Sequence, residues 1–198
     1  MISSEKVGPT VASDIQRDAA IAILLSCVAI FLYIAARFRN WSWGIGGLIS
    51  LIFNTLFVVS FFSIFTGVLP FTLDIDQQFI AAILTIIGYS LNDTVVIFDR
   101  IREYRTLYPK RDIWENINEA LNSTLSRTVN TSATTLVVLL AIAIFGGEVI
   151  RGFAVALAIG VAICPFTSVL VSTPIVYELW KRRHGREEKK AMKGKTAR

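Results

Sequence analysis

Five long apolar runs constrain this chain more than any other feature. They hold candidate membrane spans at about 19–36, 43–68, 77–98, 126–145 and 152–177, in a chain that is 54% hydrophobic. About 20 apolar residues cross a bilayer as an α-helix, and the runs lack the alternation of a membrane barrel strand. Since only helices and closed barrels satisfy their backbone groups in lipid, the sequence predicts an all-α, polytopic membrane helix bundle with five transmembrane helices.

More polar segments flank and interrupt this transmembrane domain of residues 19–180. Residues 1–18 form an extracytoplasmic lead, in which Pro9 favours an extended or turn conformation, and residues 181–198 form a basic cytoplasmic tail. Residues 112–125 begin with a capping box at Asp112 and carry apolar residues at helical spacing. They predict a short cytoplasmic amphipathic helix, which lies at the membrane interface or docks on another subunit.

The positive charge follows the topology of the chain. Of the 20 Lys and Arg residues, 17 fall on one side of the predicted spans, and cytoplasmic loops of membrane proteins carry such an excess. We therefore expect an outside N-terminus and a cytoplasmic C-terminus in a bacterial inner membrane, with lipids as partners and no nucleic acid. The lead has no cleavable signal, so we expect a further membrane helix upstream of it.

The third span carries polar residues near its cytoplasmic end. On a helical wheel, Gly88, Asn92 and Asp93 fall in one arc, and Thr94 follows them. Gly88 leaves room for another backbone to approach closely. This arc predicts a polar face that packs against a neighbouring helix, with Gly88 at the contact.

The fourth span has a polar stripe of its own. Ser126, Arg127, Asn130 and Thr134 follow one another at helical spacing. Because a lone charge facing lipid costs about 2.5–3.5 kcal/mol or more, the two polar faces are expected to meet, with Asp93 paired to Arg127. Arginine keeps its proton, whereas a buried carboxyl beside it can take up and release one. The pair is thus a candidate proton relay, and a structural salt bridge that locks the two helices is the alternative.

Four segments of the sequence resemble one protein family. They are "VGP" from Val7, "AAILTIIGYSLNDTVVIFDRIRE" from Ala81, "TLSRTVNTSATTL" from Thr124 and "FGG" from Phe145. These resemble the motifs of the SecF family of protein-export membrane proteins, within the RND superfamily of proton-driven transporters. The chain corresponds to the last five of that family's six helices.

The resemblance implies a function and a set of partners. In the family, the residues at the positions of Asp93 and Arg127 lie in the membrane and are essential to proton-coupled export. The implied partners are SecD, separate or fused in one chain, the Sec translocon channel and preprotein substrates, with protons as the coupling ion and no cofactor or metal. Many relatives carry a His-Asp pair where this chain has Phe53 and Asn54, so an ionisable group from the second span is not expected here.

Three other functions fit the residues less well. Half of another RND-type transporter would lack the two long motifs, and a passive translocon scaffold would not need the charges. An intramembrane protease needs two carboxylates on separate helices, whereas Asp93 and Asp99 share one span. Cys27 and Cys164 lie inside spans and indicate small core residues. We therefore expect a transport protein with no catalytic residues.

Overall fold

Five long helices make up the described chain. The structure is a computed structural model that describes residues 9–65 and 77–183. Each helix is long and apolar enough to cross a membrane, which confirms the predicted all-α bundle; parts of the expected lead and tail, with residues 66–76, lie outside the described residues. The helices are α1 (Pro9–Phe38), α2 (Trp41–Phe65), α3 (Gln77–Leu107), α4 (Ile113–Phe145) and α5 (Glu148–Thr167).

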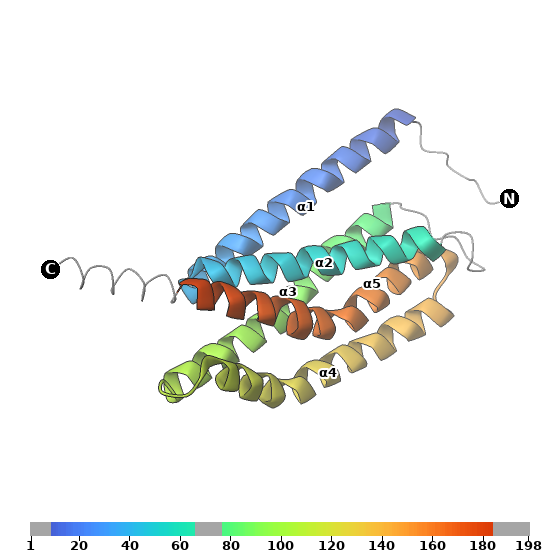
Figure 1. Cartoon of the computed structure of the whole chain (residues 1–198). Coiled ribbons are helices and arrows are strands. Elements are labelled where there is room, and N and C mark those ends of the chain that lie inside the picture. The colour runs from blue at the N-terminus through green and yellow to red at the C-terminus, as the bar shows by residue number, and fades with distance from the viewer. Residues whose placement is uncertain (1–8, 66–76, 184–198) are drawn as a thin grey trace.

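Helix α3 lies at the centre of the bundle. It packs against each of the other four helices, most extensively against α5 and α4. Close approach to α5 depends on Gly160, because a Cβ atom built there would lie 2.5 Å from Cδ1 of Ile86 on α3. Helix α1 leans away from the others towards its N-terminal end (Figure 1), and its buried apolar residues, Ile34 and Phe38, lie near its other end. The core is therefore built mainly by α2 to α5.

Helix α1 extends well beyond the predicted first span. Helix α1 begins at Pro9, where an extended or turn conformation was expected. Proline fits the first turn of a helix because its φ angle is already helical and the missing N–H has no partner there. The lead and the first span thus share one helix from Pro9 onwards.

The predicted amphipathic helix and the fourth span form one continuous helix, α4. The cap at Asp112 is confirmed, since its carboxylate accepts a hydrogen bond from the Trp114 N–H at 3.1 Å. The sequence from Ile113 to Phe145 contains neither glycine nor proline, so nothing interrupts the helix. Ile117 and Ala120 are buried against α3 and its neighbours, so this first part of α4 packs on its own bundle.

The fifth span changes its helical geometry part-way. Residues Ser168–Ser172 form a π-helical turn, and residues 173–183 continue as a helix. The Thr173 hydroxyl donates to the Ser168 carbonyl oxygen at 3.0 Å, across the wider turn. The Ser168 hydroxyl shares a 3.0 Å hydrogen bond with the Thr94 hydroxyl on α3. The π segment is thus tied directly to the central helix.

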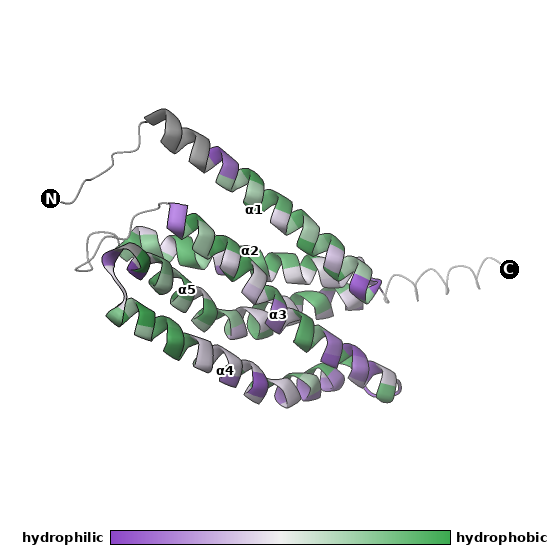
Figure 2. Ribbon diagram, turned by 180° about the vertical axis from the view of Figure 1, so that it is seen from behind, coloured by the Kyte–Doolittle hydropathy of each residue, from purple (hydrophilic) through white to green (hydrophobic). Residues whose placement is uncertain are grey.

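The bundle has a polar end. Hydrophilic residues gather where α3 ends and α4 begins and along the middle of α4 (Figure 2), while most residues elsewhere in the helices are hydrophobic. At this end, Phe38, Trp43 and Phe98 form an aromatic cluster with ring centroids 4.9–5.7 Å apart. The cluster fixes the turn between α1 and α2 against α3.

Candidate proton site

Asp93 is a buried carboxylate in the middle of the bundle. It lies on α3 with 3% of its surface exposed, between the apolar layers of Ile86 and Ile97. Its Oδ2 atom has no hydrogen-bond partner among the described residues. A buried ionised carboxylate without a partner is costly, so this position is suited to a group that can bind a proton.

Small polar side chains from four helices surround Asp93. On α4, the Ser132 hydroxyl lies beside its carboxyl. On the other side, the Cys164 thiol of α5 lies close to Ser90 and Asp93, and Asn54 of α2 donates from Nδ2 to the Cys164 Sγ at 3.0 Å. Motif spacing did not reveal this layer, because its members become neighbours only through packing. Of these neighbours, Asn54 was the one that the sequence made conspicuous, because it is an amide in a long apolar run. In the structure it is fully buried.

Arg127 lies at the edge of the site and not inside it. It is exposed and lines a pocket of about 340 Å³ between α1, α3 and α4. No ion pair joins it to Asp93 among the described residues, although its charge acts electrostatically on that carboxyl. The structure therefore places the two predicted relay residues near each other, with Asp93 buried and Arg127 open to the pocket.

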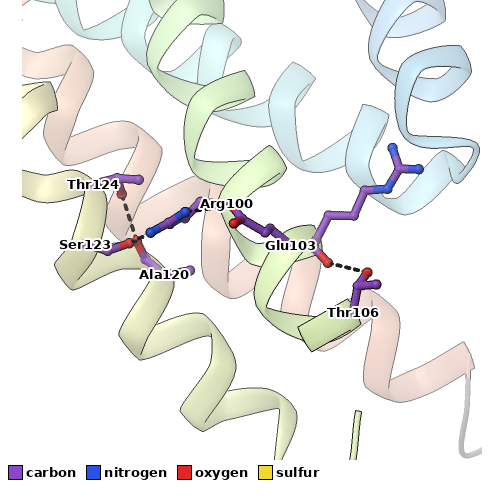
Figure 3. A network of polar contacts seen from close by, with 7 residues as sticks. Arg100, Glu103, Thr106, Ala120, Ser123 and Thr124 are labelled. Carbon is purple, nitrogen blue, oxygen red and sulfur yellow. Dashed lines mark hydrogen bonds and ion pairs between the residues drawn. The ribbon is translucent and has the colours of Figure 1, made fainter. Parts of the chain in front are cut away.

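A network of charged side chains lines the same pocket. Arg100 donates to Ser123 of α4 at 3.1 Å and to Glu103 at 2.6 Å, so its side chain reaches from α3 to α4 (Figure 3). Arg37 of α1 pairs with Asp99 of α3 at 3.2 Å. The pocket is therefore a polar cavity that leads from the charged end of the bundle towards Val95 and Val96, within one turn of Asp93.

The supporting stripe lies largely on the outside of the described chain. Asn92 is exposed, and so are the α4 residues Ser126, Asn130 and Thr134. Thr94 is buried and donates to the Ser90 carbonyl oxygen at 3.1 Å. Among the described residues, α4 thus buries Thr124, Thr128 and Ser132 in place of the predicted stripe, whereas Asp93 of the predicted α3 face is buried as expected.

Gly88 makes no helix contact within the described chain. It is exposed, and no neighbouring atom lies within 4 Å of the position that a Cβ would occupy. Within the described residues, close approach between helices occurs at Gly46, Gly47 and Gly160, and a contact at Gly88 stays a prediction. At these three glycines, apolar side chains of other helices approach the backbone closely. These contacts set the spacing of the helices.

Comparison with known proteins settles the family. A family model described as "Protein export membrane protein SecD/SecF, C-terminal" matches residues 1–182. The chain belongs to this family. A solved structure, "Crystal structure of SecDF in Super-membrane-facing form", superposes with a TM-score of 0.80 at 35% identity, over 93% of this chain and 24% of the other.

Curated SecF proteins are similar over nearly all of the chain. "Protein translocase subunit SecF" of Rhodothermus marinus is 46% identical over 186 residues, which are 94% of this chain and 60% of the relative. The SecF protein of Cereibacter sphaeroides is 39% identical, over 92% of this chain and 54% of the relative. The sequence resemblance is thereby confirmed, and the chain spans somewhat over half the length of these relatives.

Proposed function

We propose that this chain is the membrane part of a SecF-type translocase subunit that uses the proton-motive force to drive protein export. The observation that carries the proposal is the buried Asp93 carboxyl, whose Oδ2 lacks a partner among the described residues. It lies one turn from a polar pocket at the charged end of the bundle. In this proposal the bundle lies in a bacterial inner membrane, with its C-terminus in the cytoplasm.

The exposed polar face of α4 supports a SecD partner. Arg127, Asn130 and Thr134 lie in or beside the membrane part of α4 and are exposed. A charged side chain facing lipid costs several kcal/mol, and polar side chains stabilise contacts between membrane helices. A SecD half, separate or fused, would cover this face. The translocon channel and the preprotein belong to the same proposal, since the matched SecF relatives are named as translocase subunits.

Proton transfer at Asp93 would proceed between two environments. The closed core favours the neutral carboxyl, and a nearby arginine favours the ionised one. A small movement of α3 against α4 changes the balance between these two influences, so that a proton is taken up in one arrangement and released in the other. Each charge that crosses the membrane carries about 2.3 kcal/mol per 100 mV, which is the energy available to move attached domains. The chain would thus act as a transporter and not as an enzyme.

The test is proton-motive-force-dependent preprotein export by the complete complex carrying Asp93→Asn. The amide is nearly isosteric and cannot exchange the proton, so we expect export to lose its dependence on the proton-motive force. Glu178→Gln is the matched control, because this exposed carboxylate pairs with Arg182 far from the site. Normal driven export by an assembled Asp93→Asn complex would refute the relay and favour a passive scaffold.

A further inference from the structure

A second pocket lies at the charged end of the bundle, on the far side of α3 from the α4 contact. It encloses about 300 Å³ beside the turn between α1 and α2, and its lining includes Arg39, Asn40, Trp43, Arg102, Arg105 and Thr106. We propose that this pocket binds the phosphate group of an anionic phospholipid. This proposal is independent of the proton relay, since none of these residues lines the pocket near Asp93.

The lining is positive without compensation. Three of its residues are arginines and none is acidic. None of the three forms an ion pair with a described residue, because the nearby carboxylates have other partners: Asp99 pairs with Arg37 and Glu103 with Arg100. Guanidinium groups suit phosphate because their planar donors can bind two of its oxygens at once. Three such groups around one cavity favour an anionic ligand.

A fourth arginine reaches the edge of the same pocket. The Asn40 side-chain oxygen accepts a hydrogen bond from Nη1 of Arg183 at 3.1 Å and another from the Ser42 N–H, also at 3.1 Å. Asn40 lines the pocket, so the guanidinium of Arg183 lies next to the cavity. Arg105 is held in turn by the Trp180 ring, 5.3 Å from the ring centroid. Two of the four arginines, Arg105 and Arg183, are thus held by contacts between the end of the last helix and the residues around the pocket.

The pocket lies at the depth of lipid headgroups. The apolar part of α3 ends at Phe98, which is buried in the core. Arg102 follows four residues later, about 6 Å further along the helix, and Arg105 lies nearly one turn beyond it. The headgroup region adds about 5–8 Å on each side of the hydrocarbon core. A phosphate held there stays attached to a lipid whose tails lie along the bundle, and basic pockets between helices bind lipid headgroups in this way.

The backbone conformation of Arg39 is a separate indication that its side chain has a function in this pocket. Its φ angle is 51°, in the left-handed region that ends many helices and that glycine adopts most easily. An arginine at this position is unfavourable for the backbone, so its side chain is expected to have a use. Arg39→Gly removes the charge while easing the backbone, which separates loss of binding from loss of folding.

The experiment measures lipid binding to the purified complete complex by native mass spectrometry after removal of bound lipid. The probes are dioleoylphosphatidylglycerol, dioleoylphosphatidylcholine and inorganic phosphate. Arg39→Gly and Arg102→Gln remove pocket charges. Arg182→Gln is the control, because it removes a charge on the same side that pairs with Glu178 outside the pocket. Thermal unfolding of each variant is measured in parallel.

We expect phosphatidylglycerol to bind and phosphatidylcholine to bind far less. Each pocket substitution weakens phosphatidylglycerol binding about fivefold, and the pair weakens it roughly twentyfold. The control changes binding less than twofold, and Arg39→Gly unfolds no earlier than the wild type. Equal binding of the two lipids, or unchanged binding in the double variant, overturns the proposal. It is also overturned if millimolar inorganic phosphate occupies the pocket as well as the lipid does, or if the wild-type complex binds no lipid there because a protein segment fills the site.

Discussion

Gly160 on α5 sets the distance between α5 and the central helix, α3. A methyl group added there would lie 2.5, 2.6 and 2.9 Å from Cδ1, Cγ1 and Cγ2 of Ile86. Ile86 is 1% exposed, so its side chain cannot move aside into solvent. The helices must separate or Ile86 must leave its rotamer, and such overpacking costs about 1–3 kcal/mol.

The same helix offers a matched control. Gly152 also lies in α5, and no neighbouring atom lies within 4 Å of its added Cβ. Both Gly→Ala substitutions gain about 0.8–1 kcal/mol from helix propensity, so the difference between them isolates the overpacking. At about 2–4 °C per kcal/mol for a chain of this size, Gly160→Ala should unfold about 2–12 °C below Gly152→Ala.

The assay is thermal unfolding of the purified complex in detergent, followed by helical circular dichroism. Ile86→Ala removes all three contacting carbon atoms, so it should be less destabilising in the Gly160→Ala background than alone, by about 0.5–3 kcal/mol in a double-mutant cycle. Equal unfolding temperatures for the two alanine variants, together with additive effects in the cycle, would refute the packing of α3 against α5 described above.

Two further predictions concern single polar contacts. Thr94→Val leaves the buried Ser168 hydroxyl without its 3.0 Å partner, so the free energy of unfolding should fall by about 1–3 kcal/mol. Thr94→Ser keeps the hydroxyl and should retain most of the stability. Equal melting temperatures of the two variants would argue against this hydrogen bond. Arg37→Gln breaks the ion pair with Asp99, in which both side chains are about half exposed. The free energy of unfolding should fall by less than about 1 kcal/mol, and the effect should shrink with added salt. A large, salt-independent loss of stability in the same melting assay would contradict an exposed ion pair.

The sequence predicted the five apolar helices because hydropathy depends on local composition alone. The sequence was less successful at predicting which face of each helix is buried. A polar wheel assumes that polar residues turn inwards, yet Asn130 and Thr134 lie on the outside of this chain. The buried face of α4 carries Thr124, Thr128 and Ser132 instead. These residues are small, and Thr124 bonds the carbonyl oxygen one turn back at 3.0 Å, so they pack closely in a core at little cost.

Asp93 was predictable and its surroundings were not. A carboxylate within an apolar run is conspicuous in any sequence, and the structure does bury it. The neighbours Ser132 and Cys164 come from helices that are distant along the chain, and single serine and cysteine residues are ordinary in apolar spans. Their roles depend on the rotation of α4 and α5 about their axes, which is set by apolar packing and by glycine contacts such as that of Gly160.

The π turn at Ser168–Ser172 has a consequence for the length of the gene. A π turn accommodates one residue more than an α-helical turn, so losing one residue within it would restore a regular helix and leave both ends of the span in register. The same loss elsewhere in the span would rotate every later side chain by about 100° and turn Val176 away from Gly46, with which it is in close contact. Among homologous genes, single-codon gaps in this span should therefore accumulate at the π turn.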